Sequence, residues 1–99
     1  MAYSERGGSR PGFTVCGVAD VQVLPGNINR KQAIIINDSD TIIYLIKGDG
    51  PAILNAGIRL NANGGVWIIE PDNYGRLWKG AIHAITSVAA KRLVWTEDW

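Results

Sequence analysis

The residues that could carry acid–base or nucleophilic chemistry are few in this chain. His83 is the single histidine and Cys16 the single cysteine, and both stand in apolar, strand-like runs. A lone histidine between Ile82 and Ala84 is more often a hydrogen-bonded or contact residue than a general base. A cysteine in such a run is more often a small buried hydrophobic side chain than a nucleophile. No nucleophile-elbow sequence accompanies them, so we expect no catalytic residue and no enzyme.

The acidic residues also lack the patterns that catalysis or metal binding needs. Glu70 and Glu97 end predicted strands, where solvated carboxylates are common, whereas paired-carboxylate catalysis needs two acids facing one cleft. Asp38 and Asp40 form an Asp-x-Asp pair without the closing glutamate of a calcium loop, and we interpret them as turn formers. Zinc needs a cluster of His and Cys ligands, and the glycine-rich segment 61–65 lacks the Lys and Ser/Thr of a phosphate loop. No metal and no cofactor are expected.

The four tryptophans among the 99 residues indicate a function more strongly than the acidic residues do. Trp67 lies in an Ile-rich run and is expected in the core, whereas Trp78 lies among charged residues. Trp95 and Trp99 share one face of the C-terminus if it is extended, together with Glu97. Exposed aromatic side chains anchor protein interfaces, and they also stack on sugar rings. The tryptophans therefore indicate a protein interface, with a carbohydrate-binding module as the rival interpretation.

The charge balance narrows the possible partners. Ten Lys and Arg against nine Asp and Glu give a net charge of +1, whereas nucleic acids and anionic membranes attract clustered basic charge. The N-terminal residues lack the apolar core of a secretion signal, and no run approaches the ~18 apolar residues of a membrane span. We expect no nucleic acid, membrane or small-molecule ligand as a partner, and synthesis in a cytoplasm-like compartment.

Short apolar runs broken by turn residues make up the chain after residue 12. Turn signals recur roughly every 8–12 residues, which is typical of β-sandwiches and barrels, and no stretch keeps a helical period over three turns. The sequence predicts one all-β domain, residues 13–99, folded as an antiparallel β-sandwich of about seven to eight short strands. Jelly-roll-like and immunoglobulin-like connectivity both remain open. The expected strands are 13–24, 32–37, 41–47, 52–55, 58–60, 65–70, 81–87 and 92–97.

Two features predict contacts with other chains. Residues 1–12 are polar and glycine-rich, and we expect an extended arm that is disordered alone and is held by a neighbouring chain. The runs 33–36 and 41–46 are almost wholly apolar instead of alternating, and they predict a central hairpin whose second face is covered by another subunit, by the arm or by a loop. The candidate interface residues are Tyr3, Arg6, Arg10, Phe13, Tyr44, Trp78, Trp95 and Trp99.

The order of several short motifs resembles a recurrent small virion protein of tailed bacteriophages. The matching string, within residues 14 to 97, is Asn27-x-x-Arg30, an apolar strand ending at Asn37, Ile43-Tyr44, Gly48, Gly57-x-x-Leu60, Gly64-Gly65, Gly80-x-Ile82-x-Ala84-Ile85 and a strand ending at Glu97. The resemblance implies a β-sandwich accessory protein of the phage particle, located in the virion after synthesis in the host cytoplasm. Its partners would be the major capsid protein or other virion proteins, and it would form a homo-oligomer.

Three functions are compatible with this resemblance and with the aromatic residues. A capsid decoration or cement protein would use Arg6 and Arg10 against an acidic capsid surface, with Tyr3 and Phe13 as apolar anchors. A head–tail connector or tail accessory protein would share the fold but occur in few copies. A host-glycan-binding module would use exposed tryptophans, Trp78 and Trp99.

Overall fold

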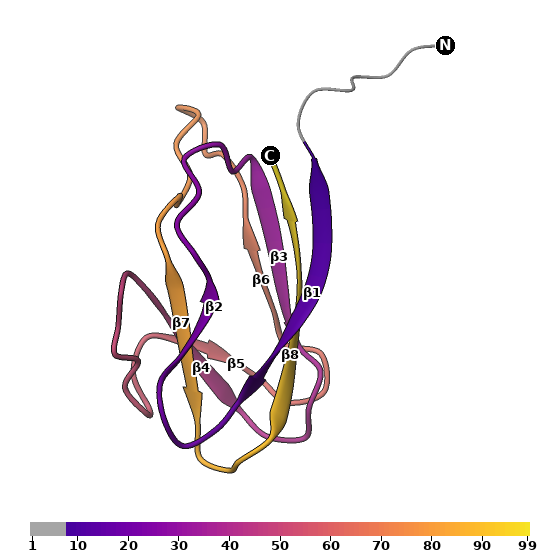
Figure 1. Ribbon diagram of the computed structural model, residues 1–99, viewed down its shortest axis with the longest axis vertical. Coiled ribbons are helices and arrows are strands. Elements are labelled where there is room, and N and C mark those ends of the chain that lie inside the picture. Colours follow the sequence, from indigo (N-terminus) through magenta and orange to yellow (C-terminus); the bar gives the residue numbers. More distant parts are fainter. Residues whose placement is uncertain (1–7) are drawn as a thin grey trace.

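The computed structural model describes residues 8–99, which contain eight β-strands (Figure 1). The strands are β1 (Ser9–Cys16), β2 (Val21–Leu24), β3 (Gln32–Asn37), β4 (Ile43–Lys47), β5 (Ile58–Leu60), β6 (Val66–Ile69), β7 (Ile82–Thr86) and β8 (Lys91–Asp98). The turns between them hold Gly and Asn at positive φ, such as Asn63, Gly64 and Gly75, a conformation that these residue types adopt readily. No helix in this part of the chain is long and apolar enough to cross a membrane.

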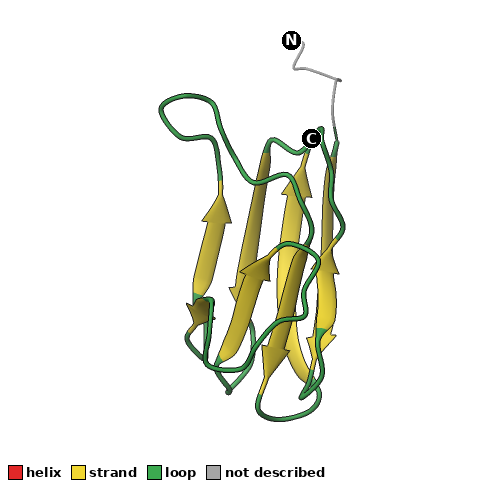
Figure 2. Cartoon of the chain, turned by 90° about the vertical axis from the view of Figure 1, so that its left-hand side faces the viewer, coloured by secondary structure: helices red, strands yellow, loops and turns green. Residues whose placement is uncertain are grey.

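The strands form two antiparallel four-stranded sheets that pack face to face (Figure 2). Sheet A has the order β1-β8-β3-β6, and sheet B has the order β2-β7-β4-β5. The first strand pairs with the eighth, the second with the seventh, the third with the sixth and the fourth with the fifth. This pairing is that of a long hairpin rolled up into a jelly roll. The predicted all-β sandwich is confirmed, and the pairing selects the jelly roll among the two connectivities.

The predicted central hairpin is wrong. Strand β3 belongs to sheet A and β4 to sheet B, so the connection 38–42 crosses from one sheet to the other. Both runs are apolar on both faces, but a four-residue polar turn permits either a hairpin or a crossover. The long-range partners decide, because β3 pairs with β6 and β8 while β4 pairs with β5 and β7.

Three predicted boundaries also differ from the structure. Strand β1 begins at Ser9, so residues 9–12 of the predicted arm are hydrogen-bonded along β8, from Ser9 opposite Asp98 to Gly12 opposite Trp95. The predicted strand 13–24 is divided by a turn at 17–20, and the predicted strand 52–55 lies in the β4–β5 connection. Gly12 leaves room for the Trp95 ring against β1, because a Cβ at this position would lie 2.5 Å from the ring.

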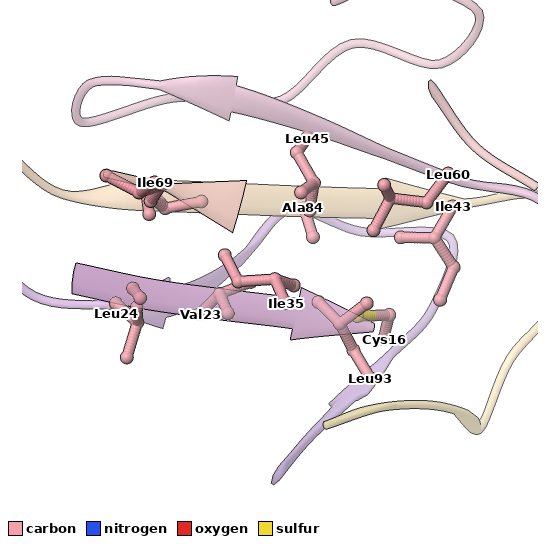
Figure 3. Close-up of a cluster of buried hydrophobic side chains, with 12 residues drawn as sticks. Cys16, Val23, Leu24, Ile35, Ile43, Leu45, Leu60, Ile69, Ala84 and Leu93 are labelled. Carbon is pink, nitrogen blue, oxygen red and sulfur yellow. The ribbon is translucent and has the colours of Figure 1, made fainter. Parts of the chain in front are cut away.

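The hydrophobic core lies between the two sheets (Figure 3). Its buried members are Cys16, Val23, Leu24, Ala33, Ile35, Ile43, Leu45, Leu60, Ile69, Ile82, Ala84 and Leu93. In most strands they alternate with outward-facing residues, as a pleated strand requires. In β2 the register shifts between Gln22 and Leu24, and both Val23 and Leu24 are buried. Burial raises the pKa of the Cys16 thiol to about 11, which matches its interpretation as a small buried side chain. The rings of Trp67 and Trp95 pack against this core.

Candidate protein-binding surface

The outer face of sheet A is an apolar surface that extends over all four strands. One row across the sheet consists of Phe13, Val94, Ile36 and Val66, which are register neighbours on β1, β8, β3 and β6. The next row contains Thr96, Ile34 and Ile68. All of these side chains point away from the core, because they alternate with buried residues on the same strands. With Val15 they form what we call the sheet A face: Phe13, Val15, Ile34, Ile36, Val66, Ile68, Val94 and Thr96.

The exposed fractions show that this face is open in the described part of the chain. Phe13 is 55% exposed, Val15 54%, Val66 51% and Ile68 47%. The side chains in the middle of the sheet are half-buried by their neighbours on the flanking strands. Contiguous apolar surface of this kind marks an interaction site, because covering the exposed half of each large side chain contributes about 1 kcal/mol.

One cation lies within this apolar surface. The Arg92 guanidinium carbon is 4.5 Å from the centroid of the Phe13 ring, at a distance typical of a cation–π contact. Arg92 Nε also lies 3.9 Å from Asp38 Oδ2, and both side chains are more than half exposed. Aromatic residues and arginine are enriched in the centres of protein interfaces, so the composition of this corner suits a protein partner.

The outer face of sheet B is covered differently. The β4–β5 connection, residues 48–57, packs over β7, and its Ala52 is 5% exposed. Asp20 holds this loop, since its Oδ1 accepts a 2.7 Å hydrogen bond from the Ala52 backbone N–H. Its Oδ2 lies 2.8 Å from His83 Nδ1 on the outer side of β7. Part of sheet B is therefore covered by the chain's own loop, whereas the sheet A face is left open.

His83 and Asp20 form a pair that the sequence pattern does not reveal, because they are 63 positions apart. Partial burial acts to raise the pKa of Asp20. The hydrogen bonds from Ala52 and His83, and the charge of His83, outweigh this effect and lower the pKa below its ordinary value. The pair anchors the β4–β5 connection to sheet B.

Replacing Asp20 by asparagine is expected to destabilise the fold at about pH 7, and this loss should vanish in acid. The lowered pKa means that Asp20 contributes stability above the pKa of a free aspartate, about 3.9, which is lost as the pH falls through the folded pKa. Urea unfolding from about pH 7 to about pH 3 measures the difference between wild type and D20N. Asp49→Asn, in the same loop, is the matched control. A difference for D20N that stays constant across this range would contradict the assigned role.

The buried charged residues form a second cluster, at the end of the sandwich where the C-terminus lies (Figure 1). Arg30 is 1% exposed and Glu97 also 1%. Arg30 Nε donates to Glu97 Oε2 over 2.7 Å, and Arg10 Nη2 lies 3.2 Å from Glu97 Oε1. The remaining Arg30 donors reach the backbone carbonyls of Trp78, Gly80 and Pro25, at 3.1, 2.9 and 2.8 Å.

This cluster corrects the sequence-based interpretation of Glu97 as a solvated strand-end acid. Glu97 belongs to the inward-facing row of β8, and Arg30 reaches it from the β2–β3 connection. The available signal was an arginine two positions before the strand that begins at Gln32, in a string that ends in a glutamate. Local patterns could not pair two residues 67 positions apart. Together the two residues tie the β2–β3 and β6–β7 connections to β8.

The predicted interface residues fall into four groups. Tyr3 and Arg6 lie outside the described residues. Phe13 lies on the sheet A face. Tyr44 is half-buried on the outer side of β4, opposite Arg59 and Ile85.

The other four predicted residues gather near the C-terminal end of the sandwich. Arg10 lies over the rings of Trp95 and Trp99, 5.3 and 5.8 Å from their centroids. Trp95 donates its indole N–H to Thr14 Oγ1, and Trp78 donates to the Ala81 carbonyl. The three tryptophans are half-buried, so they do not form an open aromatic platform.

Three comparisons with known proteins found no match to this chain. No protein-family model matches the sequence, and searches of curated proteins and of solved structures gave no significant match. Among residues 8–99 there is also no group of three or more His, Cys, Asp or Glu side chains placed to hold a metal ion. The function is therefore inferred from the surfaces described above and from the motif string.

Proposed function

We propose that this chain is a non-enzymatic structural protein of a tailed-bacteriophage particle, and that it binds the capsid lattice as a decoration protein. The observation that carries the proposal is the sheet A face, an in-register apolar surface across four strands. The motif string that resembles small phage virion proteins supports the phage context. The same string contains Ile34 and Ile36, whose outward side chains lie at the centre of this face.

The difference between the two sheets supports one-sided docking. Sheet B carries its own loop, fastened by Asp20, whereas the sheet A face has half-exposed Phe13 and Val66 at its two edges. A β-sheet is a rigid platform, so docking on it would cost little ordering free energy. Apolar side chains in its centre, with Arg92 at one corner, match the composition of stable protein interfaces.

Copy number and position in the particle test this proposal. We expect quantitative mass spectrometry of purified particles to find the chain in numbers comparable with those of the major capsid protein. A particle reconstruction should place it on the shell, with the sheet A face toward a virion protein. A few copies, set by the symmetry of the tail axis, would contradict capsid decoration and favour a connector or tail accessory protein. Absence from the particle would overturn the structural role altogether.

A further inference from the structure

A groove of about 420 Å³ opens on the other side of the molecule, on the outer side of sheet B. Tyr44 of β4 lines the groove on the side of the sheet, and Leu54 and Asn55 of the β4–β5 connection line another side. Asp40 and Thr41 of the β3–β4 connection, with Ser87 after β7, line the remaining side. The volume lies within the range of small-molecule sites.

The walls of this groove are held by contacts within the chain. The Asn37 side-chain amide donates to the carbonyls of Thr41 and Leu60 over 2.8 and 3.0 Å. Ser39 Oγ donates to Asn37 Oδ1 over 2.7 Å. On the opposite side, the bond from Ala52 to Asp20 fastens the connection that carries Leu54 and Asn55. The groove is therefore preformed, which lowers the cost of binding a ligand.

The groove offers both apolar and polar contacts. Its carboxylate is Asp40, whose Oδ1 accepts hydrogen bonds from Lys91 Nζ and Thr41 Oγ1. These bonds, the one from Lys91 first, lower the pKa of Asp40 and keep it ionised. Within residues 8–99, no hydrogen bond engages the side-chain polar groups of Tyr44, Asn55 or Ser87. The Tyr44 ring and Leu54 supply apolar surface beside these free donors and acceptors.

This combination selects a class of ligand. Lys91 neutralises the Asp40 carboxylate, so the groove carries no net charge that would favour a charged ligand. The unpaired polar groups disfavour a purely apolar ligand. A neutral sugar presents hydroxyl groups on its edge and an apolar C–H face to an aromatic ring. We propose that the groove binds a neutral saccharide unit, with its ring on Tyr44 and its hydroxyls on Asp40, Asn55 and Ser87.

The site is separate from the sheet A face, because none of the residues that line the groove belongs to that face. Both can be occupied at once, and a chain seated on a shell through sheet A would present the groove outward. The sugar site is therefore independent of the proposed docking and goes beyond it. It also differs from a platform built on Trp78 and Trp99.

Nuclear magnetic resonance titration of the full chain tests the proposal. The probes are glucose, galactose, mannose and N-acetylglucosamine with their β-linked disaccharides, each raised to millimolar concentration. We expect saturable amide shifts for at least one sugar, confined to the segments that line the groove, residues 40–44, 54–55, 62 and 87. If no probe shifts these amides, or if the shifts lie elsewhere, the saccharide site is refuted.

Two variants and one control separate binding from folding. Tyr44→Ala and Asp40→Asn should each weaken the binding of the responding sugar about tenfold or more. Tyr74→Ala removes a tyrosine that is 81% exposed outside the groove and should leave the affinity unchanged. Unchanged affinity in both groove variants would overturn the site. Ile36→Lys on the sheet A face should leave sugar binding intact, so failure of the docking proposal and failure of the sugar site are distinguishable.

Discussion

Glu97→Ala is expected to lower the free energy of unfolding by about 3–5 kcal/mol, because it leaves Arg30 charged, buried and without its carboxylate. The two side chains are 0% and 1% exposed and meet over 2.7 Å. The backbone carbonyls of Trp78, Gly80 and Pro25 would still accept from Arg30, but they carry no compensating charge. Urea unfolding followed by tryptophan fluorescence measures the loss.

Arg10→Ala is the matched control for this prediction. It removes the other partner of Glu97, but the Arg10 side chain is 50% exposed, so no buried charge is left without a partner. We expect a smaller loss, about 1 kcal/mol from the ion pair and about 0.5–1 kcal/mol from the contacts with the rings of Trp95 and Trp99. The double variant Arg30→Met with Glu97→Leu should recover part of the loss, because no buried charge remains. Similar losses for Glu97→Ala and Arg10→Ala would show that the burial of Arg30 does not govern stability.

Ile36→Lys is expected to weaken binding to the particle by at least about 30-fold, the effect of losing an interface hot spot of 2 kcal/mol or more. Ile36 stands between Val94 and Val66 at the centre of the sheet A face, where a lysine would bring a charge into a desolvated contact. The fold should persist, because the side chain points away from the core that holds Ile35. Binding of the purified variant to particles that lack the protein measures the affinity.

Ile28→Lys makes the same chemical change outside the sheet A face. Ile28 lies in the β2–β3 connection and is 80% exposed, so its replacement should leave particle binding unchanged. Equal particle binding by Ile36→Lys and Ile28→Lys would show that the sheet A face is not the surface that contacts the particle. If Ile36→Lys instead abolished self-association in solution and left particle binding intact, the face would serve contact between copies of this chain.

The fold class could be predicted because its signals are local. Turn residues such as Asn63 and Gly64 adopt positive φ with little dependence on distant contacts. Cys16 was expected to be a buried side chain and is one, because an apolar strand buries its small residues whichever sheet it joins. Trp95, Glu97 and Trp99 were expected on one face of an extended end, and β8 is extended through Asp98.

The interaction surfaces could not be predicted in the same way. The runs around Ile34 and Tyr44 were each known to be apolar on both faces. Whether they pair with each other depends on strands further along the chain, because Ile34 pairs with Ile68 and Tyr44 with Arg59. The open face was therefore expected on a hairpin, but it lies on sheet A. The groove at Tyr44 arises only where four connections meet.

Distance along the chain separates the features that the sequence predicts from those that only the tertiary structure determines. The short apolar runs and the placement of turns follow from neighbouring residues, and they specify an all-β sandwich. The pairing of Arg30 with Glu97 and that of Asp20 with His83 join residues 67 and 63 positions apart. Such contacts form only after the sheets have assembled, because no local pattern encodes which distant strand becomes a neighbour.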